Sequence, residues 1–231
     1  MVLLGLEKDP YDTFSYQINL HKRYRLKPVY FILFGKNGKY DKNLSINNHT
    51  FQDLIKHLAD YGEVGIHPSY DSDKSQKILE KEIKDLEKVL KQNIVSSRQH
   101  FLKLELPATY QNLISAGIQH DYTMGYVSEI GFRAGICDPF YFYDLDHEVK
   151  TKLKIYPLTI MEGTLKDYQK ISVEEAENIL FNLIDEVKKV DGTFISLWHN
   201  PSLNDSIKEG GWRIPYEKMI KYVFTEREKE S

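Results

Sequence analysis

Short apolar runs alternate with amphipathic helical segments along this chain, and that alternation is the feature that most constrains its fold. Val29–Phe34 is apolar throughout, as expected of a strand buried on both faces. Lys74–Gln92 carries one apolar stripe beneath a solvated surface of Lys and Glu, which predicts a helix. Strands that alternate with helices form a parallel sheet, either doubly wound or curled into a barrel.

Local signals define the other elements. We expect further strands over Glu63–Ile66, Ile94–Ser97, Ile118–Tyr122, Leu153–Ile160 and Thr193–Trp198. We expect further helices over 9–25, 50–61, Pro107–Ala116 and Pro215–Phe224, and behind the capping box formed by Ser172 and Glu175. No internal repeat, low-complexity segment or flexible linker divides the chain, so we expect a single domain.

Composition narrows the function classes. The chain has 31 Lys and Arg against 34 Asp and Glu, and this near-balance argues against nucleic acid as the main partner. A single cysteine, Cys137, excludes an internal disulfide and a cysteine-rich zinc site, and it suits a reducing compartment. No segment resembles a signal peptide or a membrane span. We therefore expect a soluble protein, in the cytoplasm, that has no membrane partner.

Ionisable side chains follow five of the predicted strands. In parallel α/β folds, functional groups gather just beyond the carboxyl ends of the strands. The residues found there are His67, Tyr70, Asp71, Arg98, His100, Asp121, Glu162, His199 and Asn200. Histidine together with carboxylate is the usual ligand set of a catalytic zinc or similar divalent ion that keeps an open position for water.

The segment EVGIHPSYDS resembles the second motif of the polysaccharide deacetylases, carbohydrate esterase family 4 with NodB homology. In that resemblance His67 matches the first metal-binding histidine, and Asp71 stands where the second is usual. SSRQHF resembles the third motif, in which His100 replaces a proline and could restore the missing imidazole. The resemblance thus implies a divalent metal, above all zinc, held by His67, His100 and Asp71.

The same resemblance implies catalytic roles. Arg98 matches the arginine that orients a catalytic carboxylate, and HDYTMGY places Asp121 as its partner. SLWHN places His199 as the acid that protonates the leaving amine. The run GFRAGICDPFYFYD makes Arg133 a candidate substrate contact, to which Tyr70 and Asn200 are added. The implied reaction is metal-assisted removal of acetyl groups from a polysaccharide or glycan.

The first motif of the family, an aspartate pair after the first strand, is not found. Asp9 and Asp12 lie at a predicted helix start, where a carboxylate ordinarily caps the helix. We therefore expect an N-terminally truncated chain, or a form without this motif, folded as a distorted or incomplete (β/α)7 barrel. Its activity would be low unless Glu162 substitutes as the base. An uncovered strand edge would favour self-association into a homo-oligomer.

Two other functions stay open from the sequence. The chain could be a catalytically incomplete relative that binds a saccharide without hydrolysing it. It could also be a hydrolase of another metal-dependent barrel family, with the same histidines and a different substrate. Metal content and acetate release would favour the deacetylase, and saccharide binding without turnover would favour the binding protein.

Overall fold

The computed structural model describes residues 9–204 and 211–230, and these form two compact units. The sheet unit comprises Lys27–Gly125 and Phe132–Leu158. The helical unit comprises Met1–Leu26, Tyr126–Gly131 and Thr159–Ser231. Each unit draws on segments far apart in the sequence, and the predicted single domain stays a prediction.

The sheet unit is built on six strands in the order β1-β2-β3-β4-β6-β5. Their bounds are β1 Val29–Leu33, β2 Glu63–His67, β3 Ser96–Ser97, β4 His120–Asp121, β5 Phe140–Asp144 and β6 Val149–Ile155. Neighbouring strands run parallel except β5, which pairs with β6 antiparallel. The predicted parallel-stranded α/β class is therefore confirmed, and it directs the loops after β2 and β3 to one edge of the sheet.

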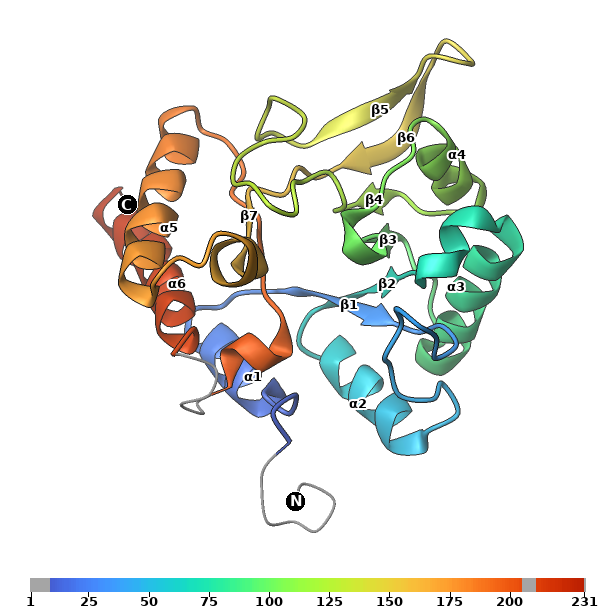
Figure 1. The fold of residues 1–231 in the computed structure, drawn as a ribbon, viewed down its shortest axis with the longest axis horizontal. Helices are drawn as coiled ribbons and strands as arrows, with labels where there is room; N and C mark the ends of the chain where they lie inside the picture. The colour runs from blue at the N-terminus through green and yellow to red at the C-terminus, as the bar shows by residue number, and fades with distance from the viewer. Residues whose placement is uncertain (1–8, 205–210, 231) are drawn as a thin grey trace. The chain divides into compact units, whose positions relative to one another are not determined.

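Three helices pack in the sheet unit, drawn in cyan to green in Figure 1: α2 His49–Ala59, α3 Gln76–Leu90 and α4 Ala108–Ser115. Ile55 of α2, Leu86 of α3 and Ile66 of β2 are completely buried. Apolar spacing along each helix places these side chains on one face. Gly117 follows α4 with a φ of 87°, a left-handed conformation that glycine adopts at no steric cost.

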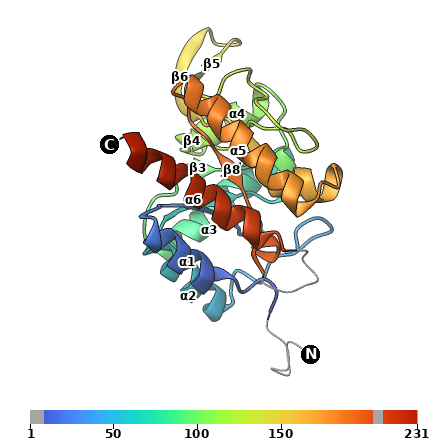
Figure 2. The same cartoon turned by 90° about the vertical axis from the view of Figure 1, so that its left-hand side faces the viewer.

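The helical unit contains α1 Phe14–Arg23, α5 Val173–Lys189, α6 Arg213–Glu230 and the parallel pair β7 Ile160–Met161 and β8 Ser196–Leu197. The helices α5 and α6 lie side by side in both views (Figure 2). Leu180 of α5 and Tyr216 and Ile220 of α6 belong to one buried cluster. The predicted capping box is confirmed: the Ser172 hydroxyl accepts from the Glu175 N–H, and the Glu175 side chain accepts from the Ser172 N–H.

Several predicted bounds were wrong. The first helix begins at Phe14, because Asp9 forms a local turn in which its carboxylate accepts from the N–H of Tyr11. The predicted strand Leu153–Ile160 is two strands, β6 and β7, which belong to different units. The predicted strand Thr193–Trp198 is paired only over Ser196–Leu197.

The strand β1 was expected to be buried on both faces, and this was wrong. All five of its residues are half-buried, because β1 is the last strand at one edge of the described sheet. An edge strand leaves one row of backbone groups without a strand neighbour. The self-association expected from such an edge stays a prediction. Within the described ranges, no helix is long and apolar enough to cross a membrane.

Candidate functional site

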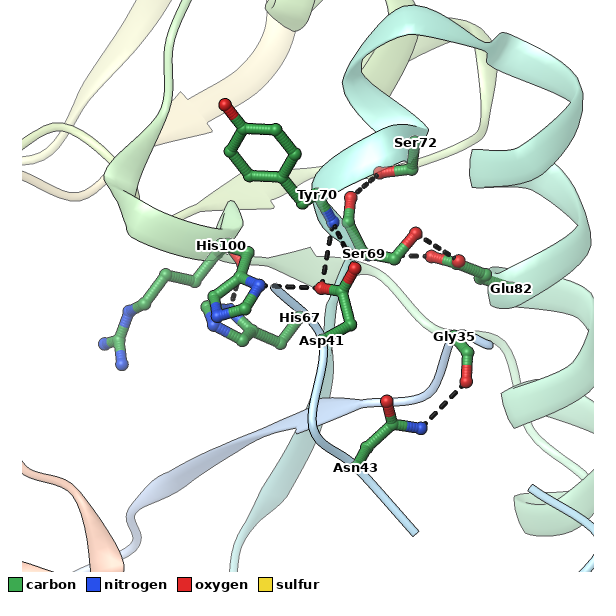
Figure 3. Close-up of polar contacts among 10 residues, drawn as sticks. Gly35, Asp41, Asn43, His67, Ser69, Tyr70, Ser72, Glu82 and His100 are labelled. Carbon is green, nitrogen blue, oxygen red and sulfur yellow. Dashed lines mark hydrogen bonds and ion pairs between the residues drawn. The ribbon is translucent and has the colours of Figure 1, made fainter. Parts of the chain in front are cut away.

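Two histidines come together in the sheet unit, beyond the carboxyl ends of neighbouring strands. His67 is the last residue of β2, and His100 begins a short 3-10 helix after β3. Because β2 and β3 pair in parallel, their ends deliver both imidazoles to one place. The ring centroids lie 4.9 Å apart, as Figure 3 shows. Both residues were predicted to lie at strand ends from the sequence, and the resemblance implied that they bind a metal; that role stays a prediction.

Each imidazole is fixed through its Nδ1 atom (Figure 3). The Nδ1 of His67 lies 2.6 Å from the backbone oxygen of Arg98, which can only accept, so this nitrogen carries a hydrogen. The Nδ1 of His100 lies 2.8 Å from the Oδ1 atom of Asp41. When a neutral imidazole donates from Nδ1, its lone pair is on Nε2. Both rings are therefore held as metal-binding histidines commonly are, with a carbonyl or carboxylate behind them.

Asp41 is a site residue that sequence reasoning missed. It lies in the loop between β1 and α2 and is only 4% exposed. Its carboxylate accepts from His100 and, at 3.0 and 3.2 Å, from the backbone N–H of Tyr70. It follows the Asn37-Gly38 turn without any motif around it, so no local signal marks it. Its role depends on the path of a loop that tertiary contacts determine.

The loop that follows His67 is anchored by a second buried carboxylate. Glu82 of α3 accepts from the Ser69 N–H at 2.9 Å and from the Ser69 hydroxyl (Figure 3). Burial raises the pKa of Glu82, against the hydrogen bonds from Ser69 that lower it. Gly35 fits against this pair: a Cβ atom there would lie 2.5 Å from Glu82 Oε1. The α3 surface, predicted to be a solvated charged face, thus includes one buried glutamate.

The fit of this site to a divalent ion is partial. Two imidazoles held through Nδ1 are suitable zinc ligands. Asp71, the predicted third ligand, is exposed in the first turn of a 3-10 helix. Among the described residues, no group of three His, Cys, Asp or Glu side chains is arranged to hold a metal. Asp71 as a ligand stays a prediction.

Arg98 follows β3, and Asp121 is the last residue of β4, the next strand of the sheet. Asp121 is completely buried and accepts from the Ser97 hydroxyl at 2.8 Å and the Thr123 hydroxyl at 2.7 Å. Burial raises the pKa of Asp121, while these hydrogen bonds and the charge of Arg98 lower it. The guanidinium of Arg98 lies 4.3 Å from the centroid of the Phe31 ring. A carboxylate this enclosed suits positioning better than contact with substrate.

Aromatic side chains lie next to the two histidines. The rings of Tyr40 and Tyr70 are 4.4 Å apart, and Phe101 lies 5.9 Å from Tyr70 and stacks on His100 at 4.4 Å. Tyr40 is 44% exposed and Phe101 51% exposed. We call Tyr40, Tyr70 and Phe101 the aromatic platform. Phe101 also has a φ of 59°, a left-handed conformation that is costly for a bulky residue and is typically retained at functional sites.

Arg133 is exposed, and its charge lies near the buried hydroxyl of Tyr110 in the same unit. Burial raises the pKa of Tyr110, the Asp121 carboxylate raises it further, and Arg133 lowers it. The predicted contact of Arg133 with substrate stays a prediction.

The helical unit contains a second cluster of hydrogen-bonded polar side chains, formed by Glu162, His199 and Ser202. Glu162 follows β7, is 3% exposed, and accepts from the Nδ1 atom of His199 at 2.8 Å and from the His199 N–H at 2.9 Å. The Ser202 hydroxyl donates to the same oxygen at 3.0 Å. Burial opposes ionisation of Glu162, but the charge and hydrogen bonds of His199 prevail and lower the pKa of Glu162. A buried carboxylate thus orients a histidine whose side chain is 56% exposed.

Asn200, predicted to contact substrate, forms hydrogen bonds with Tyr11, Thr13 and Gln17 in the helical unit. Its Nδ2 atom donates to the backbone oxygen of Tyr11 at 3.2 Å, and its Oδ1 atom accepts from Gln17 at 3.2 Å. Its backbone oxygen accepts from Thr13. Both ends of its amide are therefore engaged in the fold.

Comparisons with known proteins agree with this architecture. No protein-family model matches the chain, and no curated protein matches it at a significant level. Among solved structures, the chain is similar to a protein from Mycobacterium smegmatis assigned to the polysaccharide deacetylases, with 14% identity, a TM-score of 0.69, and coverage of 93% of this chain and 71% of that one.

Two further structures have a TM-score of 0.63. Puue allantoinase is 11% identical, over 92% of this chain and 66% of its own. A protein from Pseudomonas aeruginosa PAO1, also assigned to the polysaccharide deacetylases, is 13% identical, over 93% of this chain and 66% of its own. The chain thus spans about two thirds of the length of these proteins. It has the fold of the polysaccharide deacetylases, as the sequence resemblance predicted.

Proposed function

We propose that this chain is a hydrolase that removes acetyl groups, as N-acetyl amides or O-acetyl esters, from an acetylated glycan. The observation that carries the proposal is the pair of histidines at the ends of β2 and β3, each held through Nδ1. That pair lies at the edge of the sheet where α/β enzymes gather their functional groups. The likeness to solved polysaccharide deacetylases supports the same reaction class.

We assign a divalent ion, with zinc as the first choice, to His67 and His100, and Asp71 remains the proposed third ligand. Such an ion, when bound, polarises an acetyl carbonyl and a water molecule. The chain itself contributes the orientation of both imidazoles. Asp41 and the Arg98 carbonyl prevent the rings from turning, and this preorganisation is what second-layer partners of metal sites provide.

His199 is the proposed general acid. Glu162 accepts from its Nδ1 atom, so the proton that would pass to a leaving amine is carried on Nε2. The carboxylate also stabilises the protonated ring by its charge. Glu162 accepts from His199 and Ser202, so we assign it to orienting the acid rather than to the role of base. With no side chain assigned as the base, the proton of the attacking water would pass to bulk solvent, and we expect slow turnover. Arg98 and Asp121 are proposed as positioning residues.

The aromatic platform favours a saccharide as ligand. Exposed aromatic rings that lie a few ångströms apart present apolar faces on which sugar rings can stack. The same platform supports the alternative function, a relative that binds a saccharide without hydrolysing it. A platform without a complete metal site would be enough for binding.

Release of acetate tests the proposal. Purified chain, supplied with zinc, is incubated with a panel of N- and O-acetylated oligosaccharides, in parallel with the variants His67→Ala and His199→Ala. We expect release by the wild type and a loss of about 100-fold or more in each variant. Equal release by all three proteins would indicate a contaminant. Saccharide binding without release in the wild type would favour the binding protein.

A further inference from the structure

A groove lies in the sheet unit, bounded by the loop after β1 and by the helices α2 and α3. Its volume is about 870 Å³. Five of the residues that line it are lysines: Lys36, Lys56, Lys81, Lys88 and Lys91. Asp85 is the one acidic residue among the described residues that line it. We call it the lysine groove.

The charge of this groove opposes that of the whole chain. The chain has a formal net charge of −3, whereas the lining carries five positive charges and one negative. Lys81 and Lys88 share the carboxylate of Asp85, and Lys56 pairs with Asp53 at 3.0 Å. The positive excess of the groove is therefore carried by Lys36, Lys91 and one charge of the trio around Asp85. A concave surface that concentrates one sign of charge attracts ligands of the other sign.

The lining also includes four side-chain amides, from Asn37, Asn43, Asn47 and Gln52. The Nδ2 atom of Asn43 donates to the backbone oxygens of Gly35 and Leu44, at 2.8 and 2.9 Å, which fixes the orientation of this amide. Its Oδ1 atom is buried and accepts from no described residue. A buried acceptor ordinarily finds a donor, so a hydroxyl or water from outside the chain would satisfy it.

We propose that the lysine groove binds an acidic saccharide, a sugar chain that carries carboxylate, sulfate or phosphate groups. The lysines supply charge, and the amides supply the hydrogen bonds that sugar hydroxyls make. A single-stranded nucleic acid would need exposed rings for its bases, but Phe34, the one aromatic in the described lining, is 1% exposed. The saccharide part of this inference rests on the proposed function, and the anionic part rests on the lysines.

One loop connects the lysine groove with the histidine site inside the sheet unit. Asp41 accepts from His100, and two residues later Asn43 donates to Gly35 and lines the groove (Figure 3). A chain bound in the groove therefore lies against the loop that also orients His100. The groove is thus placed to select acidic glycans for the neighbouring site.

Binding of a labelled oligogalacturonate, whose sugars carry carboxylates, tests the inference. Its methyl ester, with the same sugars and no charge, is the matched ligand control, and a sulfated oligosaccharide of equal length separates carboxylate from sulfate. The variant Lys36→Gln/Lys91→Gln removes two charges from the groove. Lys77→Gln/Lys152→Gln removes two exposed charges elsewhere on the same unit. Affinity is measured at several salt concentrations.

We expect the groove variant to weaken binding of the uronate by about three- to tenfold and the control variant to leave it unchanged. The methyl ester should bind at least tenfold more weakly than the uronate. Equal loss in the two variants, equal affinity for the ester, or no binding at all would overturn the inference. Tighter binding of an RNA of equal charge, lost in the groove variant, would overturn it as well.

Acetate release from a neutral N-acetylated oligosaccharide separates this inference from the proposed function. The groove variant should retain the wild-type rate, because neither lysine belongs to the proposed catalytic machinery. Release of acetate without uronate binding would refute the lysine groove alone. Uronate binding that depends on Lys36 and Lys91, without acetate release from any substrate, would refute the proposed hydrolase alone.

Discussion

In each of the two histidine sites, one buried carboxylate fixes the orientation of an imidazole ring. Asp41 accepts from His100, and Glu162 accepts from His199; both carboxylates are at most 4% exposed. The positions of both histidines could be predicted from the sequence because each follows an apolar run, Ile94–Ser97 or Thr193–Trp198, that indicates a strand. Asp41 could not, because its loop is placed by tertiary contacts that leave no local pattern.

Loss of Asp41 should weaken zinc binding. In Asp41→Ala the Nδ1 atom of His100 has lost its carboxylate, so the ring can turn, and such losses typically reduce metal affinity about 10- to 100-fold. Competition with a chelating dye measures the dissociation constant. Asp53→Ala, an exposed aspartate of α2, is the control. Wild-type affinity in a folded Asp41→Ala protein would show that the carboxylate does not support a metal site.

Acid should destabilise the helical unit through His21. This residue is 5% exposed, its Nε2 atom lies 2.5 Å from the Tyr216 hydroxyl, and burial lowers its pKa to about 4. An unfolded histidine titrates near pH 6.5, so between about pH 6.5 and 4 the unfolded chain binds a proton that the folded chain does not. Stability should fall through this window by up to about 3 kcal/mol.

The comparison that isolates His21 is the free energy of unfolding in urea, measured for the wild type and His21→Gln at several pH values across that window. The variant should show a shallower decline with acidification, because glutamine does not titrate. The stability of the variant at neutral pH can differ from that of the wild type, because the quantity compared is the slope of the unfolding free energy against pH. An identical slope in both proteins would mean that other groups account for the acid sensitivity.

Helices were easier to predict than strands, for a physical reason. The stripe of α3 and the capping box of α5 are local patterns, and both are present as predicted. The strands β3, β4, β7 and β8 are two residues long, too short to carry a period. Apolar runs do not predict the β5–β6 hairpin, because Val149–Ile155 alternates apolar and polar residues, as an antiparallel strand with one solvent-exposed face does.

The capping box at the start of α5 leads to a testable prediction about stability. Ser172→Ala removes the acceptor for the Glu175 N–H, and loss of such a cap costs about 1 kcal/mol. We expect the free energy of unfolding to fall by about that amount in urea titrations. Ser128→Ala, at an exposed position of the same unit, should change it by less than about 0.5 kcal/mol. An equal loss of unfolding free energy in the two variants would show that the capping box does not stabilise the protein.

At the scale of the molecule, each compact unit holds one part of the proposed chemistry. The sheet unit holds the two fixed histidines, the aromatic platform and the lysine groove. The helical unit holds the oriented acid. The fold class and resemblance were predictable because strand-end motifs occur in order along the chain. The division into units was not, because both are assembled from distant segments.

The most direct test of the central claim is a single-turnover experiment. The zinc-loaded chain, in excess, is mixed with an oligosaccharide whose acetyl groups carry an isotope label, and NMR follows free acetate and bound sugar together. We predict that the acetyl signal of the sugar is replaced by free acetate with the wild type and persists with His199→Ala. A bound sugar signal that stays fully acetylated with the wild type, across neutral and acidic glycans, would contradict the account.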